Sequence, residues 1–222
     1  VEYRIRKDVK TLRGMRLGEF ADELSTDSPA PGGGSVAALC GALASALAAM
    51  VGNLTHGRKG HEAAWDEMER IALEGQALKD AFLLDVDRDT DAFNAVMSAM
   101  RLPKATDDEK AARAAAMDRA NEGATLVPLG VLRRSVDALR LVEAAGARGN
   151  QNSVSDAGVA ALCALACAEG AYLNVRINLA SMTSPAVATF VEATGREAAA
   201  LLAQAEAQAS AIRASVRAKL GG

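Results

Sequence analysis

Aromatic residues are scarce in this chain of 222 residues, since tryptophan, tyrosine and phenylalanine together make up only 3% of it. Valine, isoleucine and threonine do not gather into alternating runs, so the sequence offers few candidates for β-strands. Alanine supplies much of the 50% hydrophobic fraction, and alanine is the strongest helix former. The sequence therefore predicts an all-α fold with enough apolar residues for a substantial core.

Basic clusters and metal-binding patterns are also missing. The formal net charge is −3, and its 28 acidic and 25 basic residues are spread along the chain, which argues against nucleic acid as a partner. Cys40, Cys163 and Cys167 all lie in apolar helical sequence, which is typical of reduced core thiols and predicts a cytoplasmic protein. Because His56 and His61 are far from these cysteines, we expect no metal site.

One long uncharged run raises the question of a membrane span. Val36–Thr55 contains twenty residues without a charge, which is long enough to cross a bilayer. Alanine, glycine and serine dominate this run, no aromatic belt flanks it, and Gly41, Ser45 and Ala48 form a narrow side suited to close helix contact. We therefore expect a buried core or dimer-interface helix, and no membrane partner. Val1–Lys10 is charged and lacks the apolar core of a secretory signal.

Prolines, glycines and capping residues set the predicted helix boundaries. A short helix is expected over Leu17–Ser25, followed by an irregular segment at Pro29–Ser35, where two prolines and three glycines oppose regular structure. The other helices are expected over residues 35–55, 62–100, 106–145, 154–179 and 185–221. Pro128 marks a point where the third of these could be interrupted. We find no repeat, linker or second domain, so the chain is expected to form one domain.

Asp89 is the first candidate for chemistry. At 100° per residue it shares one arc of its predicted helix with the apolar residues Leu78, Phe82, Phe93, Val96 and Met100. A carboxylate among apolar neighbours has a raised pKa, which suits general acid or base work. A structural aspartate bonded to a neighbouring helix fits the pattern equally well. Asp87, Asp91 and Asn94 lie on the opposite side of the helix, where a solvated face is expected.

The helix after Ser153 presents small and polar residues on one face, namely Asp156, Cys163, Cys167, Gly170, Asn174 and Asn178. At a rise of 1.5 Å per residue, Asp156 and Asn174 are roughly 27 Å apart and cannot meet at one reacting atom of the same subunit. They can serve two ends of a long ligand, two sites related by dimer symmetry, or only hydrogen bonds between helices.

The glycines of Pro31–Ser35 place backbone N–H groups before a predicted helix, a geometry that can receive an anion or carboxylate. The segment lacks the spacing of the GxxxxGKS phosphate loop and of the GxGxxG dinucleotide turn, and a tight turn is the simpler interpretation. Arg101 and Lys104 flank Pro103 beyond a helix end, where cations are also favoured by the helix dipole alone.

Taken together, these segments resemble the formimidoyltetrahydrofolate cyclodeaminases, a family that includes free-standing methenyltetrahydrofolate cyclohydrolases. The resemblance rests on SPAPGGGSVAAL (28–39), MVGNLT (50–55), DRDTDAFNAVM (87–97), RLPK (101–104), GNQNSVSDAGVAALCA (149–164) and GAYLNVRIN (170–178). Their order and spacing agree from Leu17 to Leu179. Val1–Arg13 looks like the junction to an upstream transferase domain in bifunctional members. The likeness fades beyond Ser181, where the family commonly carries an aspartate and this chain reads SMTSPAVATF.

The resemblance implies a bundle of long antiparallel helices, assembled as homodimers or higher even oligomers, with a tetrahydrofolate derivative in a groove between helices. It implies no metal and no bound cofactor. Cyclodeaminases, which are ammonia-lyases, convert 5-formimidoyl-tetrahydrofolate to 5,10-methenyl-tetrahydrofolate and ammonia, whereas cyclohydrolases hydrolyse the methenyl product to 10-formyl-tetrahydrofolate. The implied catalytic residues are Asp89, Asp87 and Asp156. The implied substrate-binding residues are Gly32, Gly33, Gly34, Ser35, Arg101, Lys104, Asn152, Ser153, Asn174 and Asn178.

The junction-like start and the RLPK and SVSDAGV blocks look closest to bifunctional enzymes, so we expect a cyclodeaminase, with the cyclohydrolase reaction as the alternative. A formimidoyltransferase, fused or separate, is the partner that this resemblance implies. A third hypothesis is a folate-binding protein that channels substrate without chemistry. Arg101 and Lys104 are expected to bind the carboxylates of the folate tail, including those of polyglutamylated substrates.

Overall fold

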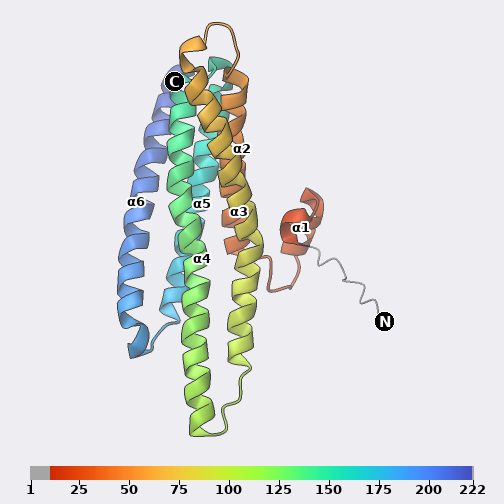
Figure 1. Ribbon diagram of the computed structural model, residues 1–222, viewed down its shortest axis with the longest axis vertical. Helices are drawn as coiled ribbons and strands as arrows, with labels where there is room; N and C mark the ends of the chain where they lie inside the picture. The colour runs from red at the N-terminus through yellow and green to blue at the C-terminus, as the bar shows by residue number, and fades with distance from the viewer. Residues whose placement is uncertain (1–10, 222) are drawn as a thin grey trace.

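The computed structural model describes residues 11–221, and within that range the chain is helical with no strand, as the sequence predicts (Figure 1). The helices are α1 (Leu17–Leu24), α2 (Gly33–Thr55), α3 (Trp65–Met100), α4 (Asp107–Arg148), α5 (Val154–Ala180) and α6 (Ala188–Lys219). Single turns of 3-10 helix precede α1, α3, α5 and α6. The first ten residues of the predicted junction segment lie outside the described residues.

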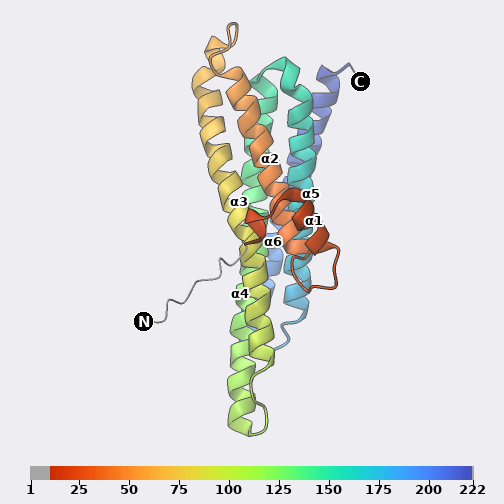
Figure 2. The same cartoon turned by 90° about the vertical axis from the view of Figure 1, so that its right-hand side faces the viewer.

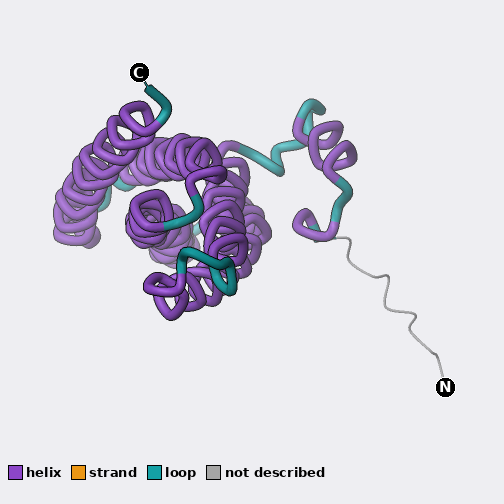
Figure 3. The backbone as a smooth tube through the Cα atoms, turned by 90° about the horizontal axis from the view of Figure 1, so that it is seen from above, coloured by secondary structure: helices purple, strands orange, loops and turns teal. Residues whose placement is uncertain are grey.

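The helices from α2 to α6 run alternately up and down and form one antiparallel bundle (Figures 1 and 2). α2 packs against α3 and α5, α4 packs against α3 and α5, and α6 lies along α4 and α5. α1 lies to one side of the bundle, as the end-on view in Figure 3 shows, and its Phe20 is buried. The bundle of long antiparallel helices that the family resemblance implied is therefore confirmed.

Helix length determines where the bundle is open. α3 has 36 residues and α4 has 42, so they are about 54 Å and 63 Å long, whereas the 23 residues of α2 span only about 35 Å. The hairpin of α3 and α4 consequently projects past the start of α2 (Figure 2). In the part of α3 that follows Asp89, the large apolar side chains of Phe93 and Met100 are consequently exposed.

Small residues allow α2 and α3 to pack closely. Gly41, Ser45 and Ala48, the narrow side of the uncharged run, are all buried, as predicted. At Gly52 a Cβ atom would lie 2.6 Å from the carbonyl oxygen of Met68, closer than carbon and oxygen can approach. An alanine-rich and glycine-rich helix is therefore what this position in the core requires.

Two helical segments are long and apolar enough to cross a membrane by length and composition, namely α2 and Gln151–Ala180. The bundle buries 61% of the most apolar stretch of α2, as expected of a core helix. It buries only 39% of the corresponding stretch of α5, so one apolar side of α5 is uncovered.

The predicted start of α2 at Ser35 was wrong by two residues, because the helix already begins at Gly33 and includes Gly34. The first turn of α2 is stabilised by a side chain from α3, described below, which a local reading of glycine and proline content does not detect. α4 continues without a break through Pro128. The carbonyl that this proline leaves without its helical partner accepts a hydrogen bond from α5.

Candidate functional site

An open groove of about 480 Å³ lies at the point where α2 begins. Its walls come from α2, α3, α4 and α5, and they include Gly33, Asp89, Phe93, Met117, Asn174 and Asn178. Apolar side chains are frequent in the walls, and the polar side chains are one carboxylate, three amides and the hydroxyls of Thr90 and Ser181. The groove therefore has the composition of a binding site for a small molecule that is partly apolar.

Asp89, on α3, lies beside the start of α2 and is half-buried. The Ser35 N–H donates to its Oδ2 at 3.0 Å, and the Ser35 hydroxyl lies 3.2 Å from the same oxygen and 2.9 Å from the Val86 carbonyl. Burial raises the pKa of Asp89, and the hydrogen bonds from Ser35 oppose this effect only in part. The inward position and the raised pKa agree with the expectation from the apolar arc.

Gly34 makes room for this carboxylate. A Cβ atom built at Gly34 would overlap the carboxyl carbon and both oxygens of Asp89, whereas at Gly33 the nearest atom would be Asn174 Nδ2, 3.7 Å away in ordinary contact. Of these two neighbouring glycines, only Gly34 is therefore required by the packing of the Asp89 side chain.

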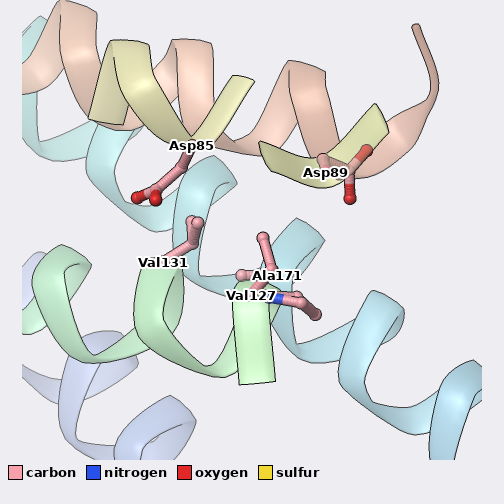
Figure 4. Close-up of a pocket in the computed structure, with 7 residues that line it drawn as sticks. Asp85, Asp89, Val127, Val131 and Ala171 are labelled. Carbon is pink, nitrogen blue, oxygen red and sulfur yellow. The ribbon is translucent and has the colours of Figure 1, made fainter. Parts of the chain in front are cut away.

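A second aspartate, Asp85, lies one helical turn from Asp89 and is only 2% exposed (Figure 4). It accepts a hydrogen bond from Arg88 at 3.0 Å and forms a short ion pair with Arg134 of α4. The Arg134 guanidinium also lies 5.9 Å from the centre of the Phe82 ring. Two carboxylates on one helix face thus have different surroundings, since guanidinium groups pair with Asp85, whereas among residues 11–221 only the neutral donors of Ser35 bond Asp89.

The space between these two aspartates is a narrow gap with no room for a water molecule. Val127, Val131 and Ala171 line it, as Figure 4 shows. Apolar walls around Asp89 are a sufficient cause for the desolvation that raises its pKa. Sequence reasoning missed Asp85, although its spacing of four residues from Asp89 places both on one helix face.

Asn174 and Asn178 bring amide groups to the α5 wall of the groove. The Nδ2 group of Asn174 donates to the Gly170 carbonyl at 2.8 Å, and that of Asn178 donates to the Ala124 carbonyl of α4 at 2.9 Å. Both side chains are therefore held by the protein through their nitrogen atoms. From α4 the groove also receives Met117 and Asn121, which sequence reasoning did not single out.

Several predicted site residues lie elsewhere in the same chain. Asp87 lies on another side of α3, where its Oδ2 pairs with Arg13 Nε at 3.1 Å, and it does not line the groove. Asn152, Ser153 and Asp156 lie at the start of α5, far along the helix from Asn174. Within one subunit, the structure does not bring these four residues to the groove.

The other predicted residues are at or near the groove. Gly32, Gly33 and Gly34 line it, and Ser35 is buried beneath it with its N–H bonded to Asp89. Arg101 and Lys104 are exposed in the connection from α3 to α4. They follow Met100, which lines the groove, so their charges lie beyond its α3 end.

The three thiols do not form part of this groove, and burial raises the pKa of Cys40, Cys163 and Cys167. Among residues 11–221, histidine, cysteine and acidic side chains do not converge in any group of three that could hold a metal ion. The absence of a metal or cofactor from the reaction stays a prediction.

Comparison with known proteins assigns the family of this chain. The family model described as formiminotransferase-cyclodeaminase matches residues 16–200, a range that includes every residue lining the groove. The chain belongs to this family. Its structure is similar to the crystal structure of formiminotetrahydrofolate cyclodeaminase from Thermotoga maritima, with a TM-score of 0.76, 31% identity, and coverage of 94% of this chain and 96% of the other.

Similar family members carry two different names. A methenyltetrahydrofolate cyclohydrolase from Methylorubrum extorquens is 39% identical over 201 residues, which are 90% of this chain and 95% of that protein. The formimidoyltransferase-cyclodeaminase of Mus musculus is 35% identical over 210 residues, 95% of this chain but only 38% of the mouse protein. The chain thus spans a little over a third of that bifunctional relative. These relatives are folate-processing enzymes of one-carbon metabolism.

Proposed function

We propose that this chain is a formimidoyltetrahydrofolate cyclodeaminase, an ammonia-lyase, with Asp89 as its acid–base group. The observation that carries the proposal is a carboxylate of raised pKa in a largely apolar groove, hydrogen-bonded to the neutral N–H and hydroxyl donors of Ser35. Such a group can both accept and return a proton. The named cyclodeaminase from Thermotoga maritima, similar over nearly its whole length, supports the same reaction.

The proposed reaction begins when the 10-nitrogen of the folate attacks the formimidoyl carbon, which forms the new C–N bond. Asp89 takes the proton that the 10-nitrogen loses, and its negative charge also stabilises the cationic amidine. The tetrahedral carbon then bears an amino group. Asp89 returns the proton to this group, the C–N bond to it breaks, and ammonia leaves 5,10-methenyl-tetrahydrofolate.

The similarity to a cyclohydrolase supports a second candidate, in which water adds to the methenyl carbon and 10-formyl-tetrahydrofolate forms. One pair of assays distinguishes the two reactions. With 5-formimidoyl-tetrahydrofolate, the purified chain should release ammonia and form the methenyl chromophore faster than the uncatalysed reaction. Background ammonia release with rapid hydrolysis of added methenyl-tetrahydrofolate would instead establish the cyclohydrolase. Folate binding without either activity would indicate a channelling partner.

Gly34→Ala should lower turnover by roughly tenfold or more, because the new Cβ displaces the Asp89 carboxylate from Ser35 and from its position in the groove. Gly33→Ala is the matched control, since its Cβ would meet only ordinary contact distances. Turnover and the melting temperature should be measured for both variants. Equal activity in the two variants would show that the position of the Asp89 carboxylate does not depend on glycine at position 34.

We also propose that Arg101 and Lys104 bind the carboxylates of the folate tail as it leaves the groove past Met100. Lys104→Met should therefore raise KM for polyglutamylated substrate more than KM for the monoglutamate. Lys110→Met is the control, because Lys110 lies on the same hairpin but pairs with Asp107. An equal change for both substrates would rule out a role of Lys104 in tail binding.

A homodimer, or a higher even oligomer built from it, is the assembly that we propose. Exposed apolar side chains follow α2 at Leu43, Met50 and Leu54 and α5 at Val159, Leu162, Leu173 and Ile177. An apolar face of this extent is typical of an interface. If two copies of α5 pack antiparallel about the middle of this face, Val159 of one copy lies near Ile177 of the other. Asp156 of the partner subunit would then lie near the groove, which Ile177 lines.

Leu173→Asp should convert the dimer to a monomer and reduce activity, because it places a charge in the proposed interface. Leu73→Asp is a close control, since Leu73 on α3 is 67% exposed and Leu173 is 66% exposed. Sedimentation at micromolar concentration gives the assembly state. A monomeric, fully active unaltered chain would contradict the proposal.

A further inference from the structure

Pro128 lies inside α4 and has no N–H group. In an α-helix the N–H of a residue bonds the carbonyl four residues earlier, so Pro128 leaves the Ala124 carbonyl without its helical partner. Asn178 of α5 supplies the missing donor, because its Nδ2 lies 2.9 Å from that carbonyl oxygen. Ala124 and Asn178 both line the groove, so this bond between helices is part of its wall.

The bond fixes which end of the Asn178 amide is available to a ligand. An asparagine side chain has one acceptor oxygen and one donor nitrogen, and here the nitrogen is held by Ala124. Asn174, one turn earlier, is held in the same way by the Gly170 carbonyl. Among the described residues neither Oδ1 atom accepts a hydrogen bond, and neither is a buried atom. The α5 wall therefore offers two acceptor oxygens of fixed orientation.

We propose that Pro128 is a positioning residue for substrate recognition, acting through Ala124 to hold Asn178 with its Oδ1 directed at the substrate. The matching ligand edge carries N–H donors, as the pterin ring does on its pyrimidine ring and amino group. The inference rests on the proposed function, since it assigns the pterin end of the substrate to the α5 wall. With the pterin there, the tail runs along Met100 toward Lys104.

The test measures the dissociation constant for 5-formyl-tetrahydrofolate by calorimetry, which needs no turnover. Asn178→Ala should weaken binding by about tenfold, the loss of one oriented hydrogen bond. Pro128→Ala restores the N–H of residue 128, which bonds the Ala124 carbonyl in place of the Asn178 amide, so it should also weaken binding by about tenfold, raising KM with kcat nearly unchanged. Because both changes act through one amide, the double variant should be weakened by about tenfold and not by about a hundredfold.

Leu126→Ala is the matched control, because Leu126 is exposed on α4, lines neither the groove nor the gap beside Asp89, and its replacement adds no backbone donor. It should leave binding unchanged. Asn178→Asp provides a second measurement, since it keeps acceptor oxygens but cannot donate to Ala124. When Pro128→Ala is added to Asn178→Asp, binding should improve. The new N–H of residue 128 then bonds the Ala124 carbonyl, which otherwise faces the carboxylate at position 178 without a donor between them.

A hundredfold loss in the double variant, or normal binding by Pro128→Ala, would overturn the inference while leaving the proposed function in place. If the unaltered chain does not bind the folate at all, the proposed function and this inference both fail. If Pro128→Ala does not fold, Asn178→Asp decides alone. Its affinity should then fall by about tenfold, as for Asn178→Ala, and an unchanged affinity would contradict the role of the Ala124 bond.

Discussion

Asp89→Asn is expected to lower turnover by about 10²-fold or more while the chain remains folded. The amide keeps an oxygen that can accept the Ser35 N–H, so the first turn of α2 is retained, but it cannot accept and return a proton. Asp91→Asn is the control, because Asp91 is exposed on the same helix. Near-normal turnover in a folded Asp89→Asn variant would remove Asp89 from the mechanism.

Comparison of Asp89→Asn with the unaltered chain also tests the raised pKa of Asp89. A carboxyl group whose pKa is higher in the folded state binds its proton more tightly there, so protonation favours folding. This contribution is fully present below the ordinary aspartate pKa of about 3.9 and is lost as pH rises through the raised value. The free energy of unfolding of the unaltered chain should therefore fall relative to that of Asp89→Asn as pH increases across this window. A constant difference would contradict the raised pKa.

Arg134→Met is expected to reduce the free energy of unfolding by about 3 kcal/mol, because it leaves the buried carboxylate of Asp85 without its main counter-charge. The Arg134 side chain is only 27% exposed and that of Asp85 only 2%, so water cannot readily solvate the Asp85 carboxylate when Arg134 is replaced. Urea unfolding followed by circular dichroism measures the loss.

Arg133→Met is the natural comparison for this prediction. Arg133 pairs with Glu197 on the surface, with side chains 51% and 41% exposed, so its loss should cost less than about 1 kcal/mol. A combined Asp85→Leu and Arg134→Met variant should recover most of the stability, because it removes both charges. Equal losses from Arg133→Met and Arg134→Met would show that the pair with Asp85 is not a buried charge interaction.

The helices were predictable because their ends are encoded locally. Thr106 and Glu109 form a capping box at the start of α4, and Pro185 opens the turn before α6, both within a residue or two of the predicted positions. The position of Asp89 followed from helical periodicity alone, since the 200° between it and Asp87 puts the two on different sides of α3. Asp89 contacts Ser35, whereas Asp87 pairs with Arg13.

The opposite wall of the groove could not be predicted in the same way. Met117 and Asn121 lie in a charged, alanine-rich part of α4 with no motif, and they line the same groove as Asp89 because α4 folds back along α3. The partner of Asp85 was hidden for the same reason, since Arg133 and Arg134 are neighbours and only packing decides which of them is buried. Periodicity within one helix does not give the rotation of one helix relative to another.

The hydrogen bond from Ser35 to Asp89 connects the proposed acid–base group to the first turn of α2, so the state of that turn should depend on the protonation of Asp89. Ser35 is in the first turn of α2, where the N–H groups have no acceptor within the helix, and the carboxylate of Asp89 on α3 accepts the Ser35 N–H. A protonated carboxyl is a weaker cap than a carboxylate. Backbone amide exchange at Ser35 should thus report, in real time and without any label on the folate, whether the site is charged or neutral.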